Sequence, residues 1–289
     1  MYTLFTDTDT DITPQEASHY GYKLISMPYI IDKKEIKPYE DFEEFKYKEF
    51  YDVLRTGVLP KTCAISPQDY KDYFKPTLEE GKDILYVHFS KAMSGTFNAM
   101  NIAINELKEE FPERTIYTID TKGITICSLN IVKEIGDLYL QGKTVEEIME
   151  WADKNVDKFA TYFYADNLKF FKLSGRISNF SAIMGSLFGV HPIITMNSEG
   201  KMVSVSKCKG KINTLKKLVD YVEELGEDIK NHRIIVGHAD AMPIAEELTK
   251  LLKERLGDDL PIEYAVVNPT AGSHCGPDTI GVCFYAKHR

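Results

Sequence analysis

Several features that define common protein classes are missing from this 289-residue sequence. No apolar run reaches the roughly 18 residues that a membrane-spanning helix needs, and the N-terminus has no signal-peptide pattern. The five cysteines are odd in number and scattered, without a CxxC motif or a Cys/His cluster at zinc-binding spacing. We therefore expect free thiols in a reducing cytoplasm, and neither a metal nor a cofactor.

Catalytic loop motifs are also absent. The sequence has no GxxxxGK[ST] phosphate-binding loop, and Ser94 lies in Ala-Met-Ser-Gly, which lacks the first glycine of the serine-hydrolase motif GxSxG. A net charge of −9 argues against nucleic acid as the main partner. What remains is an ordinary globular composition, 43% hydrophobic and 27% charged, long enough for one large or two modest domains.

Apolar strand patterns alternate with helical patterns along most of the chain. This alternation predicts an α/β fold with largely parallel sheets. The weakest join is near residue 160, so we expect two α/β domains, 1–160 and 161–289. Expected strands are 1–5, 23–31, 84–89, 115–120, 161–164, 191–197, 202–206, 233–238, 262–267 and 281–285. Expected helices are 14–20, 42–56, 67–80, 97–107, 126–141, 145–156, 167–171, 181–188, 211–225 and 241–256.

The stretch from Ile84 to Leu107 is the first candidate for a binding site. A buried strand runs into a helix through Ser-Lys-Ala-Met-Ser-Gly-Thr, a turn rich in hydroxyl groups. The first N–H groups of such a helix, together with Ser90, Ser94 and Thr96, can hold an anion. The alternative is that Ser94 only caps the helix and Gly95 eases the turn.

Three acids alternate near the start, at Asp7, Asp9 and Asp11. A calcium loop would need a glycine and a glutamate at later fixed positions, and this segment lacks both. Asp and Thr ahead of Pro14 and Glu16 are more typical of turns and a helix N-cap. We therefore expect no metal here.

Five segments, in order, resemble one family, the DegV proteins. They are TDTDTDIT, the 62–66 loop, SKAMSGT, LKFFKLSGRIS and GSHCGPDTIG. The resemblance covers essentially the whole chain. It implies two α/β domains that hold a long-chain fatty acid between them. It further implies a carrier, without catalytic activity of its own, that presents the fatty acid to an ATP-dependent bacterial fatty acid kinase, which makes an acyl phosphate for phospholipid metabolism.

The resemblance also implies a set of carboxylate ligands: Thr62, Ser94, the backbone N–H of Gly95, and His274. Such a set is physically reasonable, because a buried carboxylate without hydrogen-bond donors is very costly. The alternative for His274 is a core histidine bonded to a backbone carbonyl. Candidates for the tail pocket, for each of which ordinary core packing is the alternative, are Phe97, Met100, Ile126, Ile183, Leu187 and Phe188.

Arg176 is expected at a partner surface, exposed on a loop, with a solvated arginine or a salt bridge as the alternative. Lys207, Lys209 and Lys211 form a basic strip that suits the kinase or transient contact with an acidic membrane surface, although a solvated face is the more usual reason for such a run. The chain departs from the family in three places: Asp278 adds a negative charge near the expected anion site, Cys63 replaces a serine, and only lysines stand where arginine is common in the strip.

Two other functions remain open from the sequence. A lipid or ester hydrolase would use Ser94 as nucleophile and His274 as base. A non-catalytic binder of another small acid would use the same donors.

Overall fold

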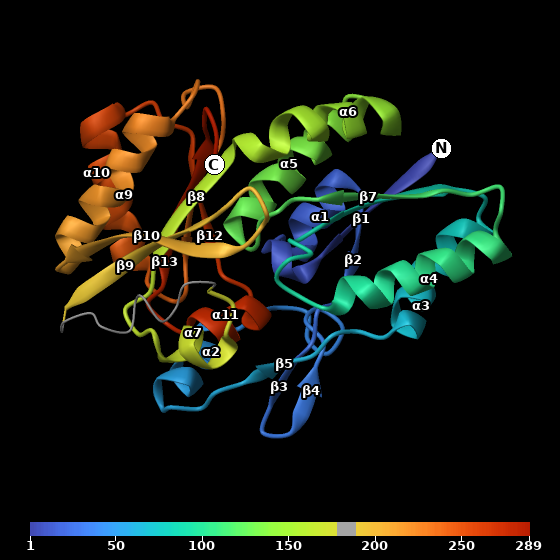
Figure 1. Ribbon diagram of the computed structural model, residues 1–289, viewed down its shortest axis with the longest axis horizontal. Helices are drawn as coiled ribbons and strands as arrows, with labels where there is room; N and C mark the ends of the chain where they lie inside the picture. Colours follow the sequence, from blue (N-terminus) through green and yellow to red (C-terminus); the bar gives the residue numbers. More distant parts are fainter. Residues whose placement is uncertain (178–188) are drawn as a thin grey trace.

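The computed structural model describes residues 1–177 and 189–289, which fold into two main sheets, a small third sheet and the helices around them (Figure 1). The predicted α/β class is confirmed. The predicted helix 181–188, with Ile183, Leu187 and Phe188, lies outside the described residues. The domain boundary near residue 160 stays a prediction. No helix in the described part of the chain is long and apolar enough to cross a membrane.

The first sheet is fully parallel, as predicted, and its strand order is β2-β1-β6-β7. Its strands are β1 (Tyr2–Asp7), β2 (Tyr22–Ile25), β6 (Asp83–His88) and β7 (Ile116–Asp120). One face packs on α3 (Pro67–Glu79) and α4 (Thr96–Glu110). The other face packs on α1 (Pro14–Tyr20), α5 (Ile126–Leu140) and α6 (Val145–Asn155).

The second sheet has the strand order β10-β9-β8-β13-β11-β12. Only β11 and β12 pair in parallel, so the prediction of largely parallel sheets is wrong for this half of the chain. α9 (Lys211–Leu225) and α10 (Met242–Leu256) cover one face. The strands are β8 (Phe159–Tyr164), β9 (Val190–Met196), β10 (Met202–Lys209), β11 (Ile234–His238), β12 (Ile262–Val266) and β13 (Ile280–Tyr285).

Helix α5 joins the two halves, because its apolar residues pack on both sheets at once. Ile126 and its neighbours on α5 share one core with Leu4 and Leu85 of the first sheet and with Ile235 and Cys283 of the second. α5 accordingly lies between the sheets in Figure 1. The N-terminal end of α5 is therefore fixed where the two sheets approach each other.

A third sheet and three short helices close one side of the junction (Figure 1). The sheet has the order β4-β3-β5, all antiparallel. Its strands are β3 (Tyr29–Ile31), β4 (Lys34–Ile36) and β5 (Lys61–Thr62), and the helices are α2 (Tyr47–Arg55), α7 (Lys169–Ser174) and α11 (Pro269–Cys275). Short 3-10 turns, η1 (Thr8–Thr10) and η2 (Val156–Lys158), follow β1 and precede β8.

Several helix starts follow directly from the sequence. Thr144 and Glu147 form a capping box at the start of α6: the Thr144 hydroxyl accepts from the Glu147 N–H, and the Glu147 carboxylate accepts from the Thr144 N–H. Thr13 and Ser66 cap α1 and α3 in the same way. These hydrogen bonds satisfy N–H groups that a helix start otherwise leaves unpaired.

Other boundaries differ from the sequence prediction. The single strand expected over 23–31 is two strands in different sheets, with a break where the Met27 N–H donates to the Thr8 hydroxyl. α2 begins at Tyr47 rather than near residue 42, and α7 starts and ends later than expected. α11 was not predicted, because Gly272 and Gly276 suggested a loop; Asn268 caps it by accepting from the Ala271 N–H.

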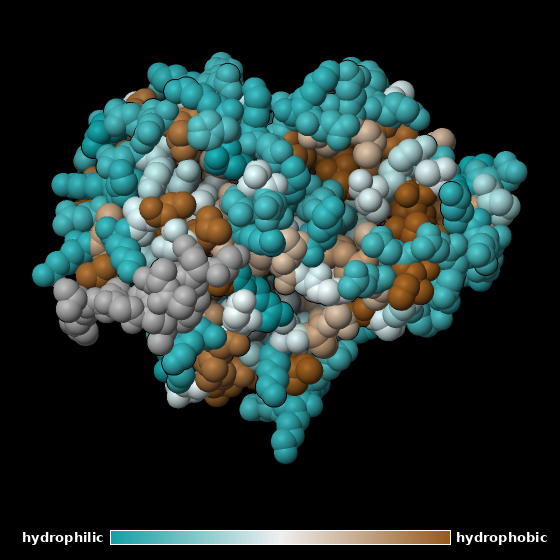
Figure 2. Space-filling model, in the orientation of Figure 1, coloured by the Kyte–Doolittle hydropathy of each residue, from teal (hydrophilic) through white to brown (hydrophobic). Residues whose placement is uncertain are grey.

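Side chains of different polarity separate as expected for a folded chain. The face shown in Figure 2 is largely hydrophilic, and hydrophobic side chains gather there in separate patches. Most large apolar residues are instead buried against the sheets. Several buried polar side chains lie at the junction between the two main sheets.

Candidate functional site

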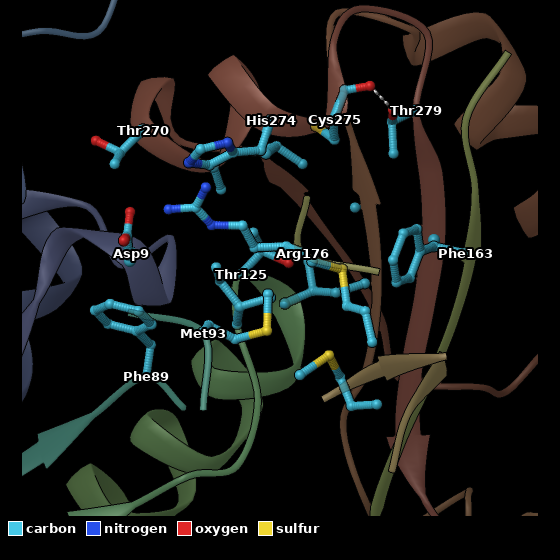
Figure 3. A pocket seen from close by; sticks show the side chains of 18 of the residues that line it. Asp9, Phe89, Met93, Thr125, Phe163, Arg176, Thr270, His274, Cys275 and Thr279 are labelled. Carbon is cyan, nitrogen blue, oxygen red and sulfur yellow. Dashed lines mark hydrogen bonds between the residues drawn. The ribbon is translucent and has the colours of Figure 1, made fainter. Parts of the chain in front are cut away.

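A cavity lies where the two main sheets meet (Figure 3). The empty space inside its walls and mouth is about 940 Å³, part of which is open to solvent. Its wall comes from the loop after β6, the start of α5, strands of the second sheet, and α11. Apolar side chains make up most of this wall, among them Met27, Phe89, Met93, Ile124, Ile126, Phe163, Phe171, Met196, Met202 and Val267.

Thr62 and His274 meet in this wall although they are far apart in the sequence. Thr62 Oγ1 lies 2.9 Å from His274 Nε2. Thr62 is placed by β5, which pairs with β3, and His274 by the last turn of α11. Burial, and then the Arg176 guanidinium, lower the pKa of His274 to about 4. The imidazole is therefore neutral at neutral pH.

The Thr62–His274 pair keeps one hydrogen-bond donor for a ligand. A neutral imidazole has one N–H and the threonine has one O–H, and the bond between the two uses one of these donors. Whichever tautomer is present, the second donor has no other acceptor among the described residues. The backbone-bonded core histidine that the sequence left open is not what is found.

Ser94 lines the same cavity, in the turn between β6 and α4. Its Oγ accepts from the Thr96 N–H at 3.2 Å, although the N-cap residue of α4 is Gly95 and not Ser94, as the alternative interpretation had it. Gly95 is exposed and is not among the residues that line the cavity. Its φ of −73° is open to any residue, so the turn does not depend on glycine there.

Arg176 faces inward, contrary to the expectation of an exposed loop arginine. Its side chain is half-buried, lines the cavity, and donates to the Ser174 carbonyl at 2.5 Å. In Figure 3 its guanidinium extends to the side of the pocket where His274 and Asp9 are drawn. Arg176 and Met93 also line a shallower hollow on the surface. Whether Arg176 contacts a partner stays a prediction.

The predicted tail residues divide between the cavity and the core. Ile126 lines the cavity. Phe97 and Met100 do not, because they are buried in the core beside it; the Phe97 ring packs on Phe89 at 4.9 Å between centroids. Both side chains instead pack α4 on the first sheet, which is the core packing that the sequence left open as the alternative.

A cluster of three buried carboxyls, the acid loop (Asp7–Asp11), lies beside the cavity. Asp7 accepts from the Tyr86 hydroxyl and the Phe89 N–H, and Asp11 accepts from the backbone and side-chain amides of Asn268. Burial raises the pKa of both carboxyls to about 7. Residues 1–177 and 189–289 contain no group of three or more His, Cys, Asp or Glu side chains placed to hold a metal ion.

Asp9 is a polar cavity residue that sequence reasoning missed. It lines the cavity directly and is only 5% exposed. The alternation of the three acids was visible in the sequence, but it indicated a turn. The position of Asp9 depends on the residue just before α5, because the Thr125 N–H donates to the Asp9 carbonyl. The sequence alone does not show that contact.

The substitutions that set this chain apart from the DegV pattern lie in different surroundings. Asp278, expected near the anion site, instead pairs with Arg55 at 3.0 Å and is not among the residues that line the cavity. Cys63 does line the cavity, and burial raises the pKa of its thiol to about 11. It therefore stays a neutral thiol.

Comparison with known proteins agrees with this architecture. The sequence profile described as an uncharacterised protein of the DegV family matches residues 1–287. A DegV domain-containing protein of Clostridium perfringens is 30% identical over 284 residues, covering 98% of this chain and 97% of the relative. The fatty acid binding DegV family protein of Streptococcus agalactiae is 27% identical, with a TM-score of 0.83, over 100% of this chain and 99% of that one.

A more distant structure shows the same fold. The DegV family protein of Thermus thermophilus, whose fatty acid binding has been described, is 24% identical with a TM-score of 0.85, and the match covers 99% of each chain. The profile and the relatives each cover nearly the full length of this sequence. The chain therefore belongs to the DegV family.

Proposed function

We propose that this protein binds a long-chain fatty acid in the cavity between its two main sheets. The observation that carries the proposal is a largely apolar cavity whose wall holds the hydrogen-bonded Thr62–His274 pair and also Ser94; these three residues are named the head-group cluster. Support comes also from the Streptococcus agalactiae relative, which is a fatty acid binding protein.

The cavity wall offers what each part of a fatty acid needs: apolar surface for the tail and hydrogen-bond donors for the carboxylate. Burial of each CH₂ contributes about 0.8 kcal/mol, so a tail of about 16 carbons gains on the order of 10 kcal/mol before the cost of ordering it. The carboxylate needs donors and a counter-charge. The head-group cluster supplies neutral donors, and Arg176 is the one permanently cationic side chain among the described residues of the wall.

The finer proposal is that the protein presents this carboxylate to a separate ATP-dependent kinase and then holds the acyl phosphate. Arg176 and Met93 line both the cavity and a surface hollow, which would bring the head group close to a docked partner. The carrier would supply positioning, and the kinase would supply ATP and phosphoryl-transfer chemistry.

The hydrolase alternative has no support in the contacts of the described residues. Ser94 Oγ accepts from the Thr96 N–H, and the bonded partner of His274 is Thr62, not Ser94. No carboxylate in residues 1–177 or 189–289 accepts a hydrogen bond from His274 to orient it as a base. We therefore propose a binding protein rather than a serine hydrolase.

Mass spectrometry of gently extracted recombinant protein tests the binding. We expect co-purified fatty acid, or stoichiometric uptake of octadecanoic or octadecenoic acid by delipidated protein. Protein that carries no lipid and takes none up would overturn the proposal. For the kinase step, loaded protein is mixed with ATP and fatty acid kinase from the same organism, and acyl phosphate is trapped by hydroxylamine. Lipid-loaded protein that yields no hydroxamate would contradict presentation but not binding.

A further inference from the structure

We infer that Asp9 makes this cavity selective for an acyl chain that carries a hydroxyl group. The inference rests on the proposed fatty acid binding and adds the class of fatty acid. Its basis is a buried polar group that lines the cavity and has no hydrogen-bond partner in residues 1–177 or 189–289.

The Asp9 carboxyl is aimed into the cavity by its backbone. The Asp9 N–H donates to Asp7 Oδ1 at 3.0 Å, and the Asp9 carbonyl accepts from the Thr125 N–H at 2.8 Å. Both ends of the residue are thus fixed, and the side chain lines the cavity. Figure 3 shows it on the side of the pocket with Phe89 and Thr270, across from Phe163.

One oxygen of this carboxyl is unsatisfied. Asp9 Oδ1 is buried and finds no hydrogen-bond partner in the described part of the chain. An unpaired polar atom in such a place is destabilising, so a native protein usually has a partner for it. The other oxygen, Oδ2, also has no hydrogen-bond partner among the described residues, and since the side chain lines the cavity, a ligand group can become a partner of this carboxyl.

The surroundings keep the carboxyl in its neutral form. Burial, and then the carboxyls of Asp7 and Asp11, raise the pKa of Asp9 well above its usual range. A neutral carboxyl offers one O–H donor and a carbonyl-type acceptor. Its best partner therefore both accepts and donates.

Among groups on an acyl chain, a hydroxyl meets this requirement. A methylene leaves both functions of Asp9 unpaired, and a keto oxygen only accepts. A second carboxylate on the ligand would place a negative charge beside the three acids of the acid loop, which is costly. A water molecule also donates and accepts, so water in place of a ligand hydroxyl is the outcome that the experiment must separate.

The experiment compares octadecanoic acid with 3-, 10- and 12-hydroxyoctadecanoic acids by competition on delipidated protein. We expect at least one hydroxylated acid to bind about tenfold to hundredfold more tightly than octadecanoic acid. Asp9→Leu should abolish this preference and bind octadecanoic acid more tightly than the unsubstituted protein does. Asp9→Asn, whose amide still donates and accepts, should keep most of the preference.

The possible outcomes separate the role of Asp9 from fatty acid binding itself. If octadecanoic acid binds as tightly as all three hydroxylated acids, water satisfies Asp9 and the inference is overturned, while fatty acid binding stands. If no acid binds, the proposed function itself fails. A hydroxyl preference that persists in Asp9→Leu also overturns the role of Asp9. Should Asp9→Leu fail to fold, the ligand series on the unsubstituted protein still decides.

Discussion

The head-group cluster and the acid loop both supply polar groups at one cavity, but burial acts on them in opposite directions. Burial lowers the pKa of His274 and raises the pKa of the three acids. Both changes favour the neutral form. The comparison teaches that the polar part of this cavity works by neutral hydrogen bonds, with Arg176 as the permanent charge among the described wall residues.

The two regions also differ in how they are built. The acid loop is local, with its carboxyls inside five consecutive residues. The Thr62–His274 pair joins residues 212 positions apart, so it depends on the seating of α11 and β5. A change that displaces the last turn of α11 should therefore damage the pair, and it reaches the acid loop only through Asn268, which caps the start of α11 and donates to Asp11.

Gly276→Ala is expected to give the largest effect. Gly276 ends α11 at a φ of +75°, and a Cβ there would overlap the Phe170 ring of α7. Strain and overpacking together should lower the free energy of unfolding by about 3 kcal/mol, measured by urea denaturation. The control is Gly57→Ala, where φ is +98° and a Cβ meets nothing within 4 Å.

The Gly57→Ala control measures the backbone strain alone, which we expect to lower the free energy of unfolding by about 1 kcal/mol. Equal losses in the two variants would show that contact between α11 and α7 does not hold the pair in place. The Gly276→Ala variant should also bind octadecanoic acid less tightly, because His274 lies two residues earlier.

The opposite pKa shifts predict opposite effects of pH on stability. His274 has a folded pKa below its unfolded value, so its contribution is full above about pH 6.5 and is lost as pH falls toward 4. Asp11 has a folded pKa near 7, above its unfolded value, so its contribution is present at low pH and is lost as pH rises toward 7.

Two neutral variants separate these contributions. From pH 7 to pH 5, the unfolding free energy of His274→Gln relative to the unsubstituted protein should rise by on the order of 2 kcal/mol. That of Asp11→Asn should fall by a similar amount, while its amide oxygen still accepts from Asn268. Urea denaturation at each pH measures both. Slopes of the same sign would refute the contrast between the two regions.

The sequence predicts the elements of this fold better than their pairing. Apolar periodicity located most strands and helices, because it depends on local burial. It could not give strand direction in the second sheet, where β13 enters between β8 and β11 from the far end of the chain. Resemblance to the DegV family supplied Thr62, Ser94 and His274. Asp9 was not identified, since its burial depends on the distant Thr125.

Thr62→Val tests the head-group cluster alone. Valine keeps the branched shape but removes the hydroxyl that meets His274, so one donor and one acceptor are lost. We expect binding of octadecanoic acid to weaken about tenfold, equivalent to about 1.4 kcal/mol, in a competition assay. Thr161→Val is the matched control, because its hydroxyl also lines the cavity but donates to the Val282 carbonyl. Weakening in both variants alike would assign the loss to general polarity rather than to the cluster.

The smallest effect is expected for Met100→Leu, which tests where the cavity ends and the core begins. Met100 is a residue of α4 that is buried in the core and does not line the cavity. A swap that conserves volume should cost less than about 1.5 kcal/mol in stability and change octadecanoic acid affinity less than about twofold. Met196→Leu, at a methionine that does line the cavity, should change the affinity several-fold, because a branched side chain alters the surface that the tail contacts. A larger affinity change at Met100 than at Met196 would mean that the tail reaches the core of the first sheet. The interpretation of the α4 residues as tail contacts would then regain support.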